Sequence, residues 1–250
     1  MTPQLPPAGL FRDEKQLADH VLEKLGEWFD VEREVTGRYW TGEPVRIDAV
    51  LRPKDTTGWH DQAPALGIEF KQSGATGYEA IAQAVSYSHC RWDGYEKIGV
   101  FLCPGPLTVA TERAREANAR RQERLSPQEL ERYRQDARNY GLRYGKVYTE
   151  RRVEYLARKR HREELGDLRY EEFLARAEGF DNLAAHEDDV ALRVQTEQLR
   201  LVGHLGVGEL LPYEDYGWTF TRSGHRIWSQ HGGVTEVPWA LGPRIGSSRR

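Results

Sequence analysis

Apolar positions change from helical to strand spacing along the first fifty residues. In residues 13–29 they recur every three or four positions, which predicts a helix with Asp13 and Gln16 as a capping pair. Residues 31–35 and 44–51 alternate apolar and polar side chains, and the stretch between them, TGRYWTGE, suits a hairpin connection. We therefore expect a helix followed by two antiparallel strands.

Three further patterned stretches extend this series. Residues 65–71, ALGIEFK, predict a third strand, and residues 78–90 predict a helix. Residues 97–103, KIGVFLC, are almost purely apolar and predict a strand buried on both faces. Because a helix joins the third and fourth strands, these two should lie parallel, whereas the first three form a meander. The pattern predicts an α/β fold with a mixed central sheet in the order αβββαβ.

The second half of the chain has a different composition. From Thr108 to about Gly179 it is dense in Arg, Glu, Gln and Ala, which predicts a helical insertion or lid, with breaks at Ser126-Pro127 and Gly166. A helix at about 188–203, a strand at 206–211 and a β-hairpin at 216–229 should follow. Three parts are expected: a core at 12–106, a charge-rich helical insertion at 107–187, and a C-terminal helix and β-hairpin at 188–242 that completes or flanks the core.

Composition excludes several classes of protein. The 250 residues, 38% of them hydrophobic, suffice for one sizeable core. The chain has no apolar run of membrane-spanning length, and MTPQLPPAGLFRDE lacks the features of a signal peptide, so we expect a soluble, cytoplasmic protein with no membrane partner. The two cysteines, Cys90 and Cys103, are too few for a disulfide framework, a four-thiolate zinc site or an iron–sulfur cluster.

Charge is unevenly distributed along the chain. The net charge of −3 argues against a protein that coats nucleic acid through its global charge. Residues 108–178, however, hold 18 Lys or Arg against 14 Asp or Glu, so this region is basic and the rest of the chain is acidic. The basic residues of the helical region are therefore the ones to consider for contacts with phosphate.

The third strand carries the candidate chemistry. Glu69 and Lys71 are two residues apart and share one face of the strand. If this strand pairs with the one before it, Asp48 should converge with them at a strand end. Two carboxylates suit Mg²⁺, with Mn²⁺ as a substitute, and the Phe70 carbonyl is a further expected ligand. Such a site can activate a water against a phosphodiester, with Lys71 orienting the water or neutralising developing charge.

These residues resemble a known family. Asp48, twenty residues, and then Glu69-Phe70-Lys71 on consecutive strands resemble the PD-(D/E)xK nuclease superfamily, which has a restriction-endonuclease-like fold. Gln83 and Tyr87 match the Q-x-x-x-Y motif that the RecB-like branch carries on the next helix. The resemblance implies that Asp48 and Glu69 bind Mg²⁺ and that Lys71 assists the attacking water. Gln83 and Tyr87, four residues apart, would project together towards the site.

The resemblance covers residues 12–103 and departs from the family pattern at three points. Ile47 stands where the family has proline, and the iron–sulfur cysteines of some RecB-like members are missing, so no such cluster is expected. For the carboxylate on the first helix Glu14 is the candidate, although a negative charge near a helix N-terminus also has an ordinary explanation. His20 is the alternative, since some RecB-like enzymes use a histidine there.

Two groups of arginines are candidates for nucleic-acid binding. In the helical region they are Arg120, Arg121, Arg158 and Arg160, and the alternative there is a solvated charged face. In the C-terminal hairpin they are Arg222 and Arg226, interleaved with Trp218, Phe220 and Trp228. For the hairpin we favour the alternative in which the aromatic side chains pack on the core.

The sequence thus favours a metal-dependent deoxyribonuclease, a hydrolase acting on ester bonds. The Q-x-x-x-Y motif favours an exonuclease, or processing of single strands or duplex ends of DNA. One alternative is a non-catalytic module that binds nucleic acid or protein on the same fold. Another is a nuclease active only with a protein partner or a second copy, docked through the helical region.

Overall fold

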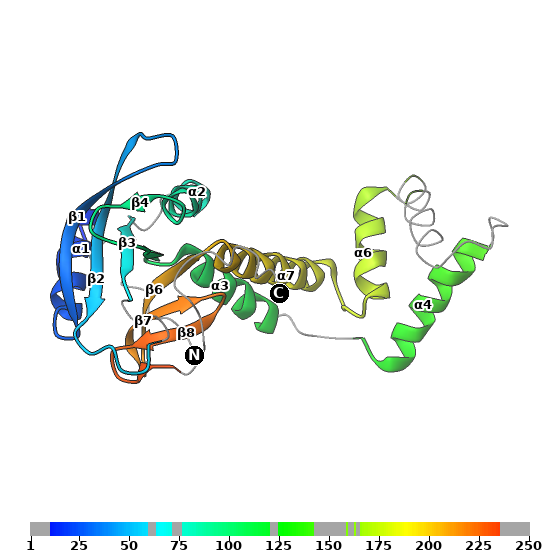
Figure 1. The fold of residues 1–250 in the computed structure, drawn as a ribbon. Helices are drawn as coiled ribbons and strands as arrows, with labels where there is room; N and C mark the ends of the chain where they lie inside the picture. The colour runs from blue at the N-terminus through cyan, green and yellow to red at the C-terminus, as the bar shows by residue number, and fades with distance from the viewer. Residues whose placement is uncertain are drawn as a thin grey trace, which may run out of the picture. The chain divides into compact units, whose positions relative to one another are not determined.

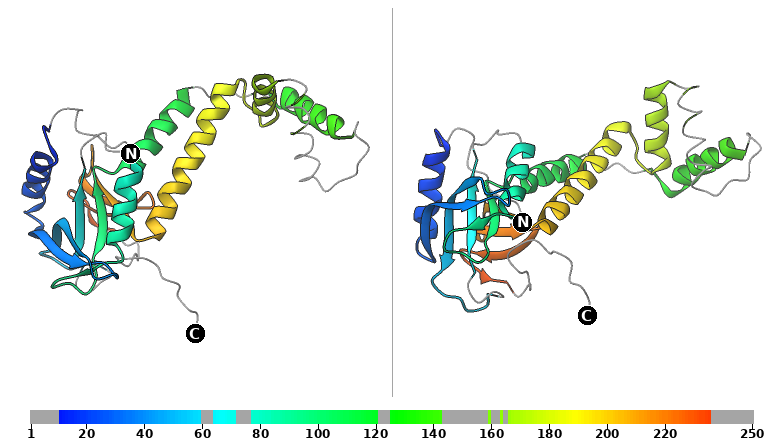
Figure 2. Two further views of the ribbon diagram at one scale, coloured as in Figure 1. Left: turned by 90° about the horizontal axis from the view of Figure 1, so that it is seen from above. Right: turned by 45° about the horizontal axis from the view of Figure 1, so that its top comes forward.

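The computed structural model describes residues 11–59, 64–71, 77–120, 125–142, 159, 163 and 166–235 (Figures 1 and 2). The chain divides into two compact units: Met1–Glu112 with Gln195–Arg250, and Arg113–Val194. Within the described ranges, every helix is too short or too polar to cross a membrane.

The first unit contains one mixed sheet with the strand order β4-β1-β2-β3-β5-β6-β7-β8-β9. Its strands are β1 (Phe29–Arg38), β2 (Pro44–Pro53), β3 (Leu66–Phe70), β4 (Arg91–Trp92), β5 (Gly99–Cys103), β6 (Val207–Tyr213), β7 (Gly217–Arg222), β8 (His225–Ser229) and β9 (Gly233–Val234). The central trio β3, β5 and β6 is parallel, and all other neighbours are antiparallel. The chain is therefore a mixed α/β protein, as predicted.

The described helices are α1 (Glu14–Leu25), α2 (Gly77–Tyr87), α3 (Pro106–Arg120), α4 (Pro127–Leu142), α6 (Asp167–Ala177) and α7 (Leu183–His204). Two of them, α1 and α2, cover opposite faces of the sheet. The buried side of α1 packs with Ile68, Phe70 and Phe101 on one face. Ala80 and Ala84 of α2 pack on the other, and Figure 1 shows α1 and α2 on opposite sides of the strands. The alternation of side chains along β3 and β5 thus builds two apolar layers.

The predicted elements of the first unit are found with shifted ends. The prediction that the first helix reaches residue 29 is wrong, because α1 ends at Leu25 and Phe29 begins β1. Phe29 lies edge-on to Trp228 with ring centroids 4.7 Å apart, so a long-range contact outweighs its helical spacing. The two-residue strands β4 and β9 were missed because so short a stretch carries no period.

The second unit contains a small helical arrangement. Ser126 and Glu129 exchange hydrogen bonds as a capping box at the start of α4, and Gly166, with φ 73°, precedes α6, so both predicted helix breaks are found. Arg176 of α6 donates a 2.8 Å hydrogen bond to the hydroxyl of Tyr133 of α4. The small apolar cluster of this unit consists of Ala175, Phe180 and Ala185.

Candidate active site

Two carboxylates meet where β2 and β3 stop pairing. The last pair of the ladder is Ala49 with Ile68, so the next residues along, Asp48 and Glu69, come to stand opposite one another. Asp48 Oδ2 accepts a 2.7 Å hydrogen bond from the Phe70 backbone N–H. A side-chain oxygen has therefore replaced the backbone partner at this end of β3, which holds the Asp48 carboxylate beside the strand that carries Glu69.

The neighbouring strand is distorted at the same level. Glu34 of β1 lies between the pairs Arg33–Ala49 and Val35–Ile47 and has φ 56°, in the left-handed region. This conformation is costly for a residue with a side chain and is typical of a strand that bends or bulges. The bend faces Asp48, at the point where its side chain turns towards β3.

Glu69 has one bonded oxygen and one open oxygen. Its side chain is only 5% exposed, and Oε1 lies 2.7 Å from Lys71 Nζ. Oε2 is buried and has no hydrogen-bond partner among the residues that the structure describes. A buried carboxylate oxygen that is left open is costly unless a cation or proton satisfies it.

Electrostatics couple the two carboxylates. Burial, together with the charge of Asp48, raises the pKa of Glu69 to about 7, although Lys71 acts in the opposite direction. Burial also raises the pKa of Asp48, opposed by the Phe70 N–H and by Lys71. Two buried carboxyl groups that lie close together cannot easily both be ionised, because their negative charges repel each other. A divalent cation bound between them would remove this repulsion.

The first helix carries two candidates for the site. Burial is the main cause of the raised pKa of Asp48 and of Glu69, and the charge of Glu14, the first residue of α1, adds a smaller contribution in the same direction. His20 is exposed, and its ring lies 5.3 Å from that of Phe11. Both Glu14 and His20 stay predictions for the helix residue of the site.

The helix after β3 presents its paired residues to the carboxylates. Gln83 Nε2 donates a 2.7 Å hydrogen bond to the Tyr87 hydroxyl, one helical turn away. Burial raises the pKa of Tyr87 to about 12, and the nearby charges of Glu69 and Asp48 act in the same direction. Gln83 and Tyr87 therefore form a bonded pair beside the two acids.

Tyr39 is a neighbour of the site that the sequence did not reveal. Its ring centroid lies 6.4 Å from that of Tyr87. Burial raises the pKa of Tyr39, with further contributions from Cys90, Glu43 and Glu69. An aromatic residue within the predicted hairpin connection TGRYWTGE was the available signal, but its approach to α2 depends on a long-range contact.

The donor set fits a hard cation with few protein ligands. Among the described residues no three His, Cys, Asp or Glu side chains gather into a metal cage. Asp48 and the open Oε2 of Glu69 supply two carboxylates, and Mg²⁺ is commonly held by one or two carboxylates with water completing its shell. The Phe70 carbonyl and Glu14 stay predicted ligands.

One arginine of the C-terminal hairpin that was predicted to contact phosphate is buried. Arg222 is 2% exposed and donates a 3.0 Å hydrogen bond to the Gly206 carbonyl, so its assignment to nucleic-acid binding is wrong. The half-buried Arg226 lies over the ring of Tyr216, 4.4 Å from its centroid. The favoured interpretation of the hairpin aromatics is confirmed, because the three that were singled out are buried in the core: Trp218, Phe220 and Trp228.

The predicted arginines of the helical region are only partly described. Arg120 is exposed at the end of α3 and lies 3.4 Å from Glu116, a pair worth little in stability. Arg121, Arg158 and Arg160 lie outside the described residues. Contact between this region and phosphate therefore stays a prediction.

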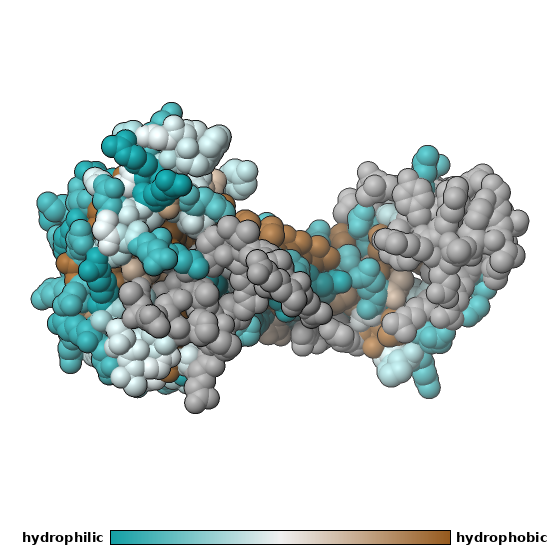
Figure 3. All heavy atoms as spheres, viewed as in Figure 1, coloured by the Kyte–Doolittle hydropathy of each residue, from teal (hydrophilic) through white to brown (hydrophobic). Residues whose placement is uncertain are grey.

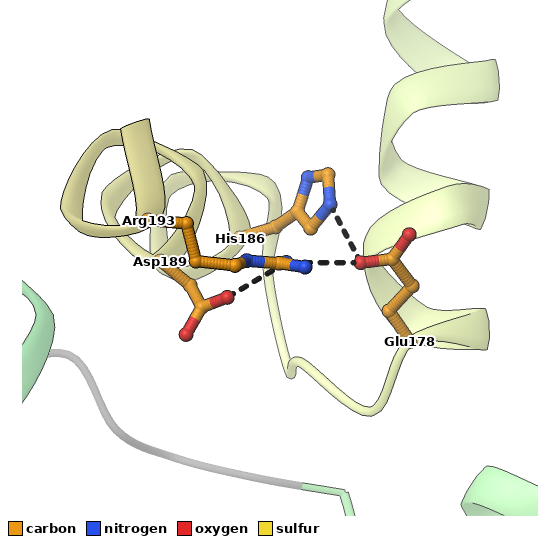
Figure 4. A network of polar contacts seen from close by, with 4 residues as sticks. All are labelled: Glu178, His186, Asp189 and Arg193. Carbon is orange, nitrogen blue, oxygen red and sulfur yellow. Dashed lines mark hydrogen bonds and ion pairs between the residues drawn. The ribbon is translucent and has the colours of Figure 1, made fainter. Parts of the chain in front are cut away.

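The second unit holds a charged cluster that at first resembles a site (Figure 4). Glu178 Oε2 lies 3.1 Å from His186 Nε2 and 3.4 Å from a guanidinium nitrogen of Arg193, whose same nitrogen lies 2.7 Å from Asp189. The guanidinium neutralises both carboxylates from between them. We interpret the cluster as a structural ion-pair network that links the end of α6 to the start of α7.

Relatives supply no further information about this site. A scan against protein-family models, a search of curated proteins and a search of solved structures each found no match for the chain. Function is therefore inferred from the side chains that β2, β3 and α2 bring together.

Proposed function

We propose that the chain is a metal-dependent nuclease that hydrolyses phosphodiester bonds in DNA, acting on ends or single strands. It would do so on a restriction-endonuclease-like core of the PD-(D/E)xK type. The observation that carries the proposal is the open, buried Oε2 of Glu69 beside Asp48, at the end of the strand that also presents Lys71. Two carboxylates that can hold a metal ion, with a lysine and a polar helix face beside them, can together catalyse metal-assisted phosphodiester hydrolysis.

Each side chain has a role that follows from its contacts. Asp48 and Glu69 would hold Mg²⁺, which supplies Lewis acidity and an acidified water when bound. Lys71, 2.7 Å from Glu69, is placed to hydrogen-bond the attacking water and to offset charge that builds on the phosphate. The bonded pair of Gln83 and Tyr87 offers an amide and a hydroxyl to orient the scissile strand.

One observation favours a second candidate. Lys71 and Glu69 form an ion pair of 2.7 Å, which is also what a purely structural pair would look like. In that case the fold would serve as a non-catalytic module that binds nucleic acid, or would cut only with a partner. The open Oε2 favours catalysis, because a structural pair gains nothing from an unsatisfied oxygen.

Cleavage by the purified chain tests the proposal. Labelled linear duplex, single-stranded and circular DNA would be incubated with Mg²⁺, Mn²⁺ or EDTA, beside the variants Glu69→Gln and Lys71→Ala. We expect metal-dependent loss of DNA that both variants lack, and sparing of circles if an end is required. Binding of DNA without any cleavage would favour the second candidate and contradict the first.

A further inference from the structure

The hairpin of β1 and β2 extends past the end of β3. β3 pairs only with Ala49–Leu51 of β2, so the part of β2 from Pro44 to Asp48 and its partner residues on β1 continue without it. The short strand β4 pairs with the free edge of this extension. Figure 1 shows the hairpin projecting beyond β3, and Figure 3 shows hydrophilic side chains over this part of the first unit.

Two arginines stand side by side on this extension. Arg38 of β1 and Arg91 of β4 are directly paired in the antiparallel register, and both are exposed. Cross-strand partners share a face with Cβ atoms about 5 Å apart, and like charges in this position destabilise a sheet. In the part of the chain that the structure describes, neither guanidinium forms an ion pair with a carboxylate, and Arg38 donates only to the Gly42 carbonyl at 3.3 Å.

Two other arginines of the same hairpin are neutralised, and a third, Arg52, lies over the ring of Tyr95, 4.3 Å from its centroid. Arg33 lies 2.5 Å from Asp19, and Arg46 lies 2.6 Å from Glu34. The pair formed by Arg38 and Arg91 therefore differs from its surroundings in presenting two positive charges together. An anion that bridges both guanidiniums would turn this repulsion into attraction.

The arginine pair is fixed to rigid elements that lead to the site. A Cβ atom on Gly37 would lie 2.5 Å from the Arg91 carbonyl and 2.7 Å from the Trp92 ring, so only glycine lets β4 approach β1 this closely. The buried Trp92 donates its indole N–H to the Tyr87 carbonyl at 3.2 Å. Arg91 thus stands on a strand that is hydrogen-bonded to the helix of the site, and Arg38 is its partner on β1.

The turn of the same hairpin carries an exposed indole. Trp40 is 87% exposed and follows Tyr39, whose ring approaches Tyr87. Hydrogen bonds between Tyr39 and both Gly42 and Glu43 fix the turn, and none of them involves the indole. A flat apolar ring two residues after Arg38 offers stacking for a base on the hairpin that also carries the arginines.

We propose that Arg38, Arg91 and Trp40 form a guiding arm that binds a single strand of nucleic acid, the guanidiniums holding phosphates and the indole stacking on an unpaired base. This inference rests on the proposed function, since the strand would lead to Asp48 and Glu69. Arg38 is paired with Pro44, four residues and roughly 13 Å along β2 from Asp48. The arm therefore lies a short distance along the hairpin from the bond that is cut, on the face opposite Trp92 and Tyr87, so the bound strand would pass around the hairpin to reach the site.

Equilibrium binding separates the arm from the chemistry. A labelled single-stranded DNA oligonucleotide would be titrated in EDTA with the full chain carrying Glu69→Gln, at several salt concentrations. Affinity falls as salt rises, so the slope of log affinity against log salt is negative. Adding Arg38→Gln and Arg91→Gln should make this slope less steep by about 0.7 for each lost phosphate contact. Adding Trp40→Ala should weaken binding on the order of tenfold, whereas Trp40→Phe should retain most of it.

Two matched controls are available on neighbouring elements. Arg33→Gln removes an ion-paired arginine from the same strand, and Tyr78→Ala removes another aromatic side chain that is 83% exposed. Tyr78 precedes Tyr87 by nine residues of α2, so the two point about 180° apart and Tyr78 faces away from the site. Neither control should change the slope or the affinity.

The outcomes for the arm and for the nuclease differ. An unchanged slope in the arginine variants, or an equal loss in the controls, would overturn the arm even if the wild-type chain cuts DNA. A less steep slope in a chain that cuts nothing would support the arm and overturn the nuclease. The arginine variants should melt no lower than the parent chain, because a like-charge pair is removed, and Arg38→Lys with Arg91→Lys should restore the slope.

Discussion

Two buried glutamates on parallel strands that are separated by one strand differ in the groups around their carboxylates. Glu69 of β3 and Glu209 of β6 are both in register with Leu102 of β5, which lies between them. Their side chains are 5% and 2% exposed, so both carboxylates are removed from water to a similar degree. Burial raises the pKa of each. The difference between them therefore lies in the groups that donate hydrogen bonds to each carboxylate.

Glu209 is satisfied by the protein itself. Its oxygens accept hydrogen bonds from the backbone N–H groups of Leu107 and Thr108, at 2.7 and 2.9 Å, and from the Thr108 hydroxyl. These groups belong to the first turn of α3, where N–H groups lack helical partners and favour a negative charge. Glu69, in contrast, has one oxygen without a hydrogen-bond partner among the residues that the structure describes. The first arrangement stabilises the fold, and the second leaves binding capacity for a ligand.

The largest effect should come from Glu69→Gln. We expect metal-dependent cleavage to fall at least about a hundredfold, because one cation ligand and the partner of Lys71 are lost. The free energy of unfolding without metal should not fall, since a buried carboxylate with an open oxygen is replaced by a neutral amide. Initial cleavage rates and urea denaturation measure the two quantities. Retained cleavage in a clean preparation would contradict the site.

The reverse pattern is expected for Glu209→Ala. The free energy of unfolding should fall by about 3 kcal/mol, because buried N–H groups at the start of α3 lose their acceptor. Cleavage per folded molecule should stay close to that of the unchanged chain, as Glu209 touches none of the site residues. Urea denaturation with an active-fraction titration would test this. If Glu209→Ala lost activity but not stability, Glu209 would be a functional residue and not a structural one.

Stability without metal should depend on pH through Glu69. Its pKa rises from 4.5 to about 7, so its favourable contribution is present below the unfolded value and is lost as pH rises through 7. The loss between about pH 5 and 8 should reach roughly 3 kcal/mol relative to Glu69→Gln, and Asp48 acts in the same direction. Urea denaturation in EDTA across this range measures it. Equal pH profiles for the two proteins would contradict the assignment, and added Mg²⁺ should restore stability at high pH only in the wild type.

The sequence predicted the elements of the site better than its surroundings. Alternation along β3 and the crossover to β5 determine where Asp48, Glu69 and Lys71 can meet, and helical spacing pairs Gln83 with Tyr87. These are local rules, so single-sequence patterns are enough to apply them.

Long-range contacts explain what the sequence left out. Glu209 finds its donors about a hundred residues away in α3, and nothing near it in the chain marks it as a helix cap. Arg222 is one of several arginines beside aromatic residues, and only the packing of β7 shows that it is buried. Tyr39 reaches the site because the hairpin lies against α2. Spacing along the chain cannot tell which polar residue a distant element will enclose.

The smallest effect should come from backbone strain beside the Glu69 site, at Glu34 of β1. Glu34 has φ 56° opposite Asp48, a conformation that Asn tolerates and a β-branched residue resists. Both Glu34→Asn and Glu34→Val lose the exposed ion pair with Arg46, so the difference between them isolates the backbone. Glu34→Val should be less stable than Glu34→Asn by about 1 to 2 kcal/mol in urea denaturation, and should also bind Mg²⁺ more weakly if the bend aims Asp48. The same exchange at Asp30, exposed on the regular part of β1, should give a far smaller difference, and equal differences at the two positions would show that the bend stores no strain.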